Sequence, residues 1–105
     1  MMQTTHDGLK GIPAFSDNRL FILTRSHFAS TGHYASYVIR SKYRSWEALR
    51  YTIPHVMNLN MFGLPHTGAD VCGYYEYDNT MTGMDEELCL RWLQLSTFFP
   101  LARHS

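Results

Sequence analysis

Three stretches of the chain are rich in apolar, aromatic or small residues, and the strand predicted in each one ends at a polar residue. They cover residues 20–24, 34–39 and 66–77. Runs of this kind, bounded by turn signals, are typical of strands buried in a parallel sheet. The polar residues that end them are Arg25, Arg40 with Ser41, and Asp70. In barrels of parallel strands the chemistry lies at the carboxyl ends, so these positions are the first site candidates.

Two further segments have the pattern of helices. Residues 2–10 are expected to end a helix, with Gly8 or Gly11 as the stop and Pro13 beyond it. A longer helix is predicted from an N-cap at Ser45 to a stop at Gly63, with one apolar stripe. Pro54 inside it is expected to kink or restart it. The stripe consists of Trp46, Leu49, Ile53, Val56, Met57 and Met61.

The last helix begins with acidic residues that complement a helix dipole, Asp85-Glu86-Glu87, and is predicted to stop at Pro100. Its apolar stripe is predicted to face a core rather than a ligand, and consists of Leu88, Trp92, Leu95 and Phe99. The order is therefore strand, strand, helix, strand, helix. Buried strands alternating with helices predict an α/β fold with a parallel sheet.

Length and charge narrow the classes of function. The chain has 105 residues, enough for one domain, and 45% of them are hydrophobic, which permits a real core. The formal net charge is zero, so a basic nucleic-acid-binding surface is not indicated. No apolar run approaches the roughly 18 residues of a membrane-spanning helix. The polar start, MMQTTHDGLK, shows no signal peptide.

The segment HTGADVCGYYEY, residues 66–77, holds the strongest candidate for chemistry. Asp is rarely buried unless it is paired, so Asp70 in a buried strand needs a reason. One interpretation is a cap for backbone N–H groups at the strand end, and the other is a site residue beside Arg25. A glycine within such a strand often marks close approach by a ligand or another backbone.

Metal and cofactor sites are not indicated by sequence spacing. The six histidines show neither HExxH nor paired His-x3-His spacing. The two cysteines, Cys72 and Cys89, lack the CxxC spacing of zinc knuckles and thioredoxin-like sites. We therefore expect no metal and no cofactor.

Several motifs in order resemble glycoside hydrolase family 31, the α-glucosidases and their relatives. They are NRLFILTRSHFASTGHYA, SWEALRYTIPHVMNLNMFGLPHTGADVCGYY and DEELCLRWLQLSTFFPLAR. The resemblance implies a (β/α)8 TIM barrel, which takes roughly 250 residues. Residues 1–105 would then be a single partial barrel segment, about strands 5–7 with the helices after strands 6 and 7.

The resemblance also implies a retaining mechanism with two carboxyl groups about 5–5.5 Å apart. The family's nucleophile is the Asp of W-x-D-M-N, a motif that is absent here. The family's acid/base is the Asp of H-W-x-G-D-N, and Ser41 stands at that position. An alcohol cannot replace a tuned carboxyl group as proton donor. We therefore expect no useful glycosidase turnover from this chain alone.

Two substrate-binding positions carry over from the family. Arg25 matches the Arg of R-S-x-F, and Asp70 matches the Asp of G-A-D-[IV]-C-G. Both groups form charge-assisted hydrogen bonds with sugar hydroxyls. The Trp of H-W is replaced by Val38, which removes an aromatic wall. The sugar-binding His of R-N-H aligns with Ser105, although a one-residue deletion would bring His104 near that position.

The cysteines match a pair that forms a disulfide in secreted and lysosomal relatives, which implies a Cys72–Cys89 bond and hints at a secretory or lysosomal origin. The alternative is two buried free thiols in a reducing compartment. By the loop-entropy model, closing a loop of about 15–18 residues contributes roughly 3 kcal/mol.

Three hypotheses for the function follow. The first is a fragment or degenerate member of a retaining α-glucosidase, which hydrolyses terminal α-linked glucose, inactive alone. The second is a non-catalytic module that binds an α-glucoside-type sugar or docks a protein. The third is a subunit that completes a barrel with another chain. Exposed sheet edges would favour such a partner, or self-association.

Overall fold

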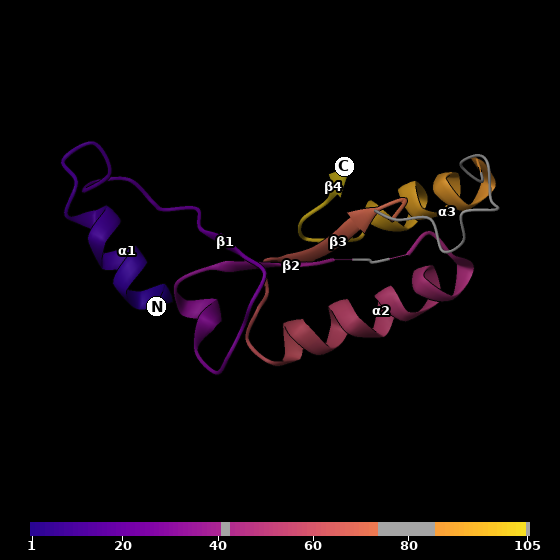
Figure 1. Ribbon diagram of the computed structural model, residues 1–105, viewed down its shortest axis with the longest axis horizontal. Coiled ribbons are helices and arrows are strands. Elements are labelled where there is room, and N and C mark those ends of the chain that lie inside the picture. Colours follow the sequence, from indigo (N-terminus) through magenta and orange to yellow (C-terminus); the bar gives the residue numbers. More distant parts are fainter. Residues whose placement is uncertain (41–42, 74–85, 105) are drawn as a thin grey trace.

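The computed structural model describes residues 1–40, 43–73 and 86–104 (Figure 1). The elements, in chain order, are α1 (Met2–Lys10), β1 (Leu23–Thr24), a 3-10 turn η1 (Thr31–His33), β2 (Ser36–Ile39), α2 (Trp46–Met61), β3 (Thr67–Val71), α3 (Glu86–Ser96) and β4 (Arg103–His104). The molecule is elongated, with extents of 49 × 26 × 22 Å, and α1 lies at the end opposite α3 (Figure 1).

The strands form one parallel sheet in the order β1-β2-β3-β4. Every residue of β3 is buried, as expected for a strand with neighbours on both sides. Parallel strands that follow one another in sheet order, with α2 and α3 as crossovers, are the arrangement of a TIM barrel. The predicted α/β class and partial barrel are therefore confirmed.

Both long helices cover the same face of the sheet. Ala69 of β3 packs with Val56 and Leu59 of α2. Val71, two residues further along the strand, packs with Leu88 and Trp92 of α3. Because alternate residues of a strand share a face, Ala69 and Val71 define the helix face. Gly68 and Asp70 consequently belong to the opposite, inner face.

Helix α2 has the ends that its sequence predicts. The Ser45 side chain accepts a hydrogen bond from the Ala48 N–H at 3.0 Å, as an N-cap. At the other end Gly63 has φ +83°, and the Leu64 N–H bonds back to the Leu59 carbonyl at 2.9 Å. This left-handed glycine is a common helix stop.

The expected restart at Pro54 is wrong, because α2 runs as one helix from Trp46 to Met61. Proline removes one N–H, which leaves the carbonyl four residues earlier without its helical partner. That carbonyl belongs to Arg50, and both residues are exposed. Water can therefore satisfy the freed carbonyl, and the helix tolerates the ring.

The predicted apolar stripe of α2 is also partly wrong. The buried residues are Thr52, Val56 and Leu59, so the face in contact with the sheet is rotated from the prediction. Thr52 is buried because its hydroxyl bonds to the Ala48 carbonyl within the helix, at 2.8 Å. The stripe residues Trp46, Ile53, Met57 and Met61 are exposed by 49%, 45%, 61% and 81%.

Helix α3 ends at Ser96 rather than near Pro100. Its last turn is tightened by hydroxyl groups: Ser96 donates to the Leu93 carbonyl at 2.8 Å, and Thr97 donates to the Gln94 carbonyl at 2.7 Å. Such local bonds compete with the helical pattern. Trp92 is fully buried and Phe99 is half-buried against the core, as predicted. Asp85 lies outside the described residues.

The outer strands differ most from expectation. The segment 20–24, predicted to be buried on both faces, contains a two-residue strand with Phe21 and Leu23 exposed by 62% and 40%. It forms an edge of the sheet, and no further strand in the described part of the chain pairs with it there. At the other edge, β4 was not predicted, because two polar residues carry no apolar signal. None of the helices in the described part of the chain is both long and apolar enough to traverse a bilayer.

Candidate functional site

The candidate site lies at the carboxyl ends of the strands, on the inner face of the sheet. Val38 pairs with Gly68, and Asp70 pairs with Arg103 of β4. Continuing the registers by one residue places Arg25 level with Val38, and Arg40 level with Asp70. The inner face therefore ends in a row Arg40–Asp70–Arg103, with Arg25 one row earlier. This row brings positive charge to both sides of one carboxylate.

Asp70 is the buried centre of this row, with a residue exposure of 2%. Its Oδ1 lies 3.6 Å from Nε of Arg103, too far for a good hydrogen bond. The same oxygen is buried without a hydrogen-bond partner in the described part of the chain. A buried carboxylate oxygen in this state needs an additional donor, so the cap interpretation of Asp70 does not account for it.

Arg25 follows β1 directly and is exposed. Strand β2 lies between it and β3, so Arg25 and Asp70 are two strands apart, on the order of 10 Å across the sheet. They share a face and an end of the sheet, but they are not neighbours. A ligand as large as a sugar ring could contact both.

The position expected for the acid/base, Ser41, lies outside the described residues, as does Ser105. Val38, which stands where the family has an aromatic wall, is buried on the inner face, at 3% exposure. His104 pairs with Val71, and so belongs to the helix face of the sheet. It therefore lies on the face opposite Asp70, away from the inner-face row.

Gly68 lies on the same inner face, one row before Asp70 and level with Val38, and it is a glycine for a steric reason. A Cβ atom at this position would overlap the Leu101 carbonyl group, in the segment that leads into β4. The close approach predicted for a glycine in this stretch is therefore an approach of backbone, not of ligand. It allows β4 to pair with β3 and carry Arg103 to Asp70.

The structure joins Cys72 and Cys89 by a disulfide, the pairing that the resemblance implied. The bond ties the residue after β3 to α3, with Cα atoms 4.6 Å apart. His104 is close by: one donor atom from each of Cys72, Cys89 and His104 lies within 4.8 Å of the others, a group that could hold a metal ion. Sequence spacing did not reveal this group, because its members come from three elements.

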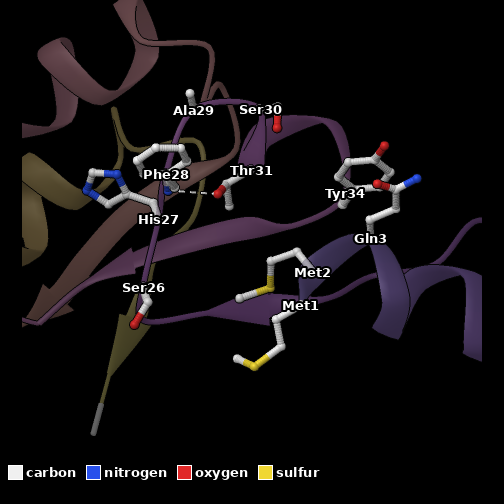
Figure 2. Close-up of a pocket in the computed structure, with 10 residues that line it drawn as sticks. All are labelled: Met1, Met2, Gln3, Ser26, His27, Phe28, Ala29, Ser30, Thr31 and Tyr34. Atoms are coloured by element: carbon white, nitrogen blue, oxygen red, sulfur yellow. Dashed lines mark hydrogen bonds between the residues drawn. The ribbon is translucent and has the colours of Figure 1, made fainter.

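A separate open pocket of about 370 Å³ lies between the start of α1 and the loop after β1 (Figure 2). Met1 and Met2, at the start of α1, lie opposite Ser26 of the loop and Thr31 at the start of η1, and the Thr31 hydroxyl accepts the Phe28 N–H at 2.9 Å. This pocket contains neither Arg25 nor Asp70. Among the described residues no carboxylate lines it, and it is distinct from the candidate site.

Sequence reasoning missed Arg103 as a site residue. Arg40 was recognised as the polar end of the second predicted strand. Only the register of the sheet shows that it is level with Asp70. Arg103 matches the Arg of the family's R-N-H motif, in which the His is the sugar-binding residue, so the motif did not indicate Arg103. The role of Arg103 becomes evident only from β4, which pairs with β3 and places Arg103 beside Asp70.

The whole chain, residues 1–105, matches the family model of the glycosyl hydrolases family 31 TIM-barrel domain. The human protein named probable maltase-glucoamylase 2 is 43% identical over 104 residues, which are 99% of this chain and 4% of that protein. Rat lysosomal alpha-glucosidase is 42% identical over 86 residues, 82% of this chain and 8% of that protein. The chain thus spans less than a tenth of each of these two relatives.

Solved structures agree with the sequence match. The glucosidase II alpha subunit superimposes with a TM-score of 0.81 at 28% identity, covering 98% of this chain and 11% of that one. The ER glucosidase II heterodimer, a catalytic subunit with the binding domain of a regulatory subunit, gives a TM-score of 0.82 at 28% identity over the same shares. The chain therefore belongs to glycoside hydrolase family 31, and its residues fall within the TIM-barrel domain of that family.

Proposed function

We propose that residues 1–105 form a single partial barrel segment that supplies part of the sugar-binding wall of a retaining α-glucosidase. The observation that carries the proposal is the buried Oδ1 of Asp70, which has no hydrogen-bond partner within the described residues. A sugar hydroxyl is a donor of the required kind. A relative named as an alpha-glucosidase makes an α-linked glucoside the substrate class to test.

The surroundings of Asp70 favour a ligand that donates hydrogen bonds. Arg103, 3.6 Å away and 37% exposed at its side chain, lies beside the carboxylate without forming a hydrogen bond to its Oδ1. A hydroxyl bonded to a charged acceptor is worth about 1.5–3 kcal/mol. Arg25, exposed at the same end of the sheet, would add a donor for a second part of the sugar.

Hydrolysis requires more than these residues. A retaining glycosidase needs two carboxyl groups about 5–5.5 Å apart. The residue at the acid/base position is Ser41, and the nucleophile motif does not occur in the sequence. Each positioned acid/base group is typically worth about 10²–10⁴-fold in rate. We therefore propose that the 105 residues bind sugar without turning it over.

Calorimetric titration with maltose tests the binding role. We expect weak binding, with a dissociation constant on the order of millimolar, and a loss of about tenfold or more in Asp70→Asn. The matched control is Asp17→Asn, the same change at an exposed residue, which should bind as the unmodified chain does. The absence of heat at high millimolar maltose, or equal binding by both variants, would contradict the proposal.

Hydrolysis of an aryl α-glucoside tests the second part of the proposal, that these residues bind sugar without hydrolysing it. We expect no turnover above the uncatalysed rate, and none after Ser41→Asp, because that change restores one carboxyl group of the two required. Turnover by the unmodified chain that disappears in Asp70→Asn would show that these residues are sufficient for catalysis, and would overturn this half of the proposal.

A second candidate function is completion of a barrel with another polypeptide. It is favoured by the exposed edge at β1, where Phe21 and Leu23 have no strand beside them in the described structure. The test is to mix the chain with a separately produced segment carrying the first four strands of a family relative. A one-to-one complex by light scattering, lost in Phe21→Lys, is expected. Failure to form a complex at about 100 μM would count against this function.

A further inference from the structure

The geometry points to a zinc site that forms when the Cys72–Cys89 disulfide is reduced, with Cys72, Cys89 and His104 as ligands; we propose it as a function separate from sugar binding. The three residues lie on different elements: after β3, within α3, and in β4. Their donor atoms lie within 4.8 Å of one another. The chemistry of this donor set, two thiolates and an imidazole, is the one Zn²⁺ prefers.

The backbone holds the three residues together without the disulfide. His104 pairs with Val71 in the β3–β4 register, and Val71 packs against Leu88 and Trp92 of α3. His104 is thereby on the helix face, on the side of α3 and Cys89. Cys72 comes directly after Val71, with φ +68°, where the chain turns out of the sheet. Three packed elements therefore converge on one point.

The exposure of the three residues gives an ion a route of entry. Cys72 is 4% exposed, and Cys89 is half-buried against the same core cluster. His104 is exposed, in contrast to both cysteines. An ion would be bound by two shielded sulfurs and closed off by an imidazole at the surface. The fourth tetrahedral position is left to water, as in zinc sites with three protein ligands.

The distances are compatible with tetrahedral zinc after a small adjustment. Zn–S bonds of about 2.3 Å and Zn–N bonds of about 2.0–2.1 Å place the ligand atoms roughly 3.5–3.8 Å apart. The donor atoms now span up to 4.8 Å, so His104 would move by about 1 Å, within the reach of a side-chain rotation. Once the sulfurs are no longer bonded to each other, they can separate to the required spacing.

The reaction balances with a dithiol as reductant. The dithiol gives two electrons and two protons to the disulfide, and is itself oxidised to a cyclic disulfide, which leaves two protein thiols. Zn²⁺ then replaces the two thiol protons, which are released to solvent, and His104 binds as the neutral imidazole. In the oxidised chain both sulfurs are bonded to each other, so the site cannot form. Zinc binding is thus expected only under reducing conditions.

Titration with Co²⁺ and Zn²⁺ tests the site in the full chain. After reduction by a dithiol and its removal under argon, one equivalent of Co²⁺ should give a thiolate-to-cobalt charge-transfer band and the visible absorption of a tetrahedral ion. Zn²⁺ should abolish both. The oxidised chain should show neither band. Reduced chain without these bands, or oxidised chain with them, would overturn the proposal.

His104→Ala separates a built site from two thiols that bind metal by themselves. Loss of a group that only orients a ligand costs roughly 10–100-fold in metal affinity, so loss of the ligand itself should cost at least about tenfold. His33→Ala, at another exposed histidine, is the matched control and should bind as the unmodified chain does. Equal zinc affinity of the two variants would refute the assignment of His104.

If reduction unfolds the chain, circular dichroism can still test the site, because it measures whether zinc restores helical structure. Zinc that binds a preformed or refolding site should restore the helical signal, because binding is then coupled to folding. A reduced chain that binds zinc but stays unfolded would overturn the proposal, since the three elements would not be brought together.

Discussion

At the scale of single residues, two histidines from different elements influence each other. Partial burial of its imidazole lowers the pKa of His55 on α2, and the charge of His27, from the loop after β1, lowers it further. His27 is held in place by an edge-to-face contact with Tyr37, with ring centroids 4.6 Å apart. A histidine whose pKa is lower in the folded chain than in the unfolded chain makes folding less favourable when it is protonated.

The free energy of unfolding should therefore depend on pH through His55. Well above about pH 6.5 the imidazole is neutral in both states and has no effect on the free energy of unfolding. As the pH falls below that value, the unfolded state gains its proton first and stability declines, until His55 is protonated in the folded state as well. Urea unfolding at pH 7.5 and pH 5 should show a smaller decline in His55→Gln than in the unmodified chain.

His27→Gln distinguishes the two causes of the His55 shift, because it removes the neighbouring charge and leaves the burial. It should reduce the decline by less than His55→Gln does. His33→Gln, an exposed histidine elsewhere, is the control and should leave the decline unchanged. We expect the effect to be modest because His55 is an exposed residue and water screens its charge. An identical decline in all four chains would contradict the role of His55.

The contrast between Asp70 and its partner shows how far single residues could be predicted. Asp70 could be found because a carboxylate in a buried strand is rare enough to demand an explanation. Arg103 could not be found, because an arginine near the end of a polar segment is ordinary. Its role depends on the pairing of β4 with β3, and pairing across the sheet leaves no mark in the local sequence.

At the scale of elements, β3 and β4 pair because Gly68 has no side chain. The Leu101 backbone occupies the space in which a Cβ atom would lie. In Gly68→Ala the segment before β4 must move away, which should separate Arg103 from Asp70. Overpacking of this kind costs about 1–3 kcal/mol or more, since backbone cannot yield as a side chain does. We expect a loss of that size in the free energy of unfolding, measured in urea.

Gly8→Ala provides the matched control for this prediction. Gly8 lies within α1, and nothing lies within 4 Å of a Cβ atom added there. Alanine in a helix interior is favoured over glycine by roughly 0.5–1 kcal/mol, so this variant should be slightly stabilised. The same substitution is thus expected to have opposite signs at the two sites. A neutral Gly68→Ala would refute the close approach of Leu101.

The ends of a helix were predicted well, because they depend on residues close in the sequence. The buried face of a helix was predicted poorly, because it depends on the elements that pack against it. Ser45 and Gly63 mark the ends of α2 by hydrogen bonds and backbone conformation that belong to the residues themselves. Which side of α2 is buried is decided by the sheet, which selects Thr52, Val56 and Leu59. Apolar periodicity gave a face rotated from this one, because Met57 and Met61 are apolar without being covered.

At the scale of the whole molecule, this partial barrel leaves apolar surface uncovered. Phe21 is 62% exposed beside the edge strand β1. On the outer side of α2, Met57 and Met61 are exposed by 61% and 81%. An unpaired edge also presents backbone N–H and C=O groups to another chain. The predicted exposed edges are thus present at β1, and self-association of the 105 residues is the expected consequence.

Self-association could use the edge at β1 or the exposed surface of α2, and a lysine introduced on each surface distinguishes the two. We expect the average mass from sedimentation equilibrium to rise between about 10 and 200 μM, because an edge contact with few covered apolar side chains gives only weak association. Phe21→Lys should lower the association constant about tenfold or more, since a lysine at an edge strand opposes strand pairing. Met57→Lys places the same charge on α2 and should have little effect if strands associate edge to edge. Dissociation by Met57→Lys but not by Phe21→Lys would assign the contact to the helix surface and contradict the edge, and a chain that stays monomeric throughout would contradict both.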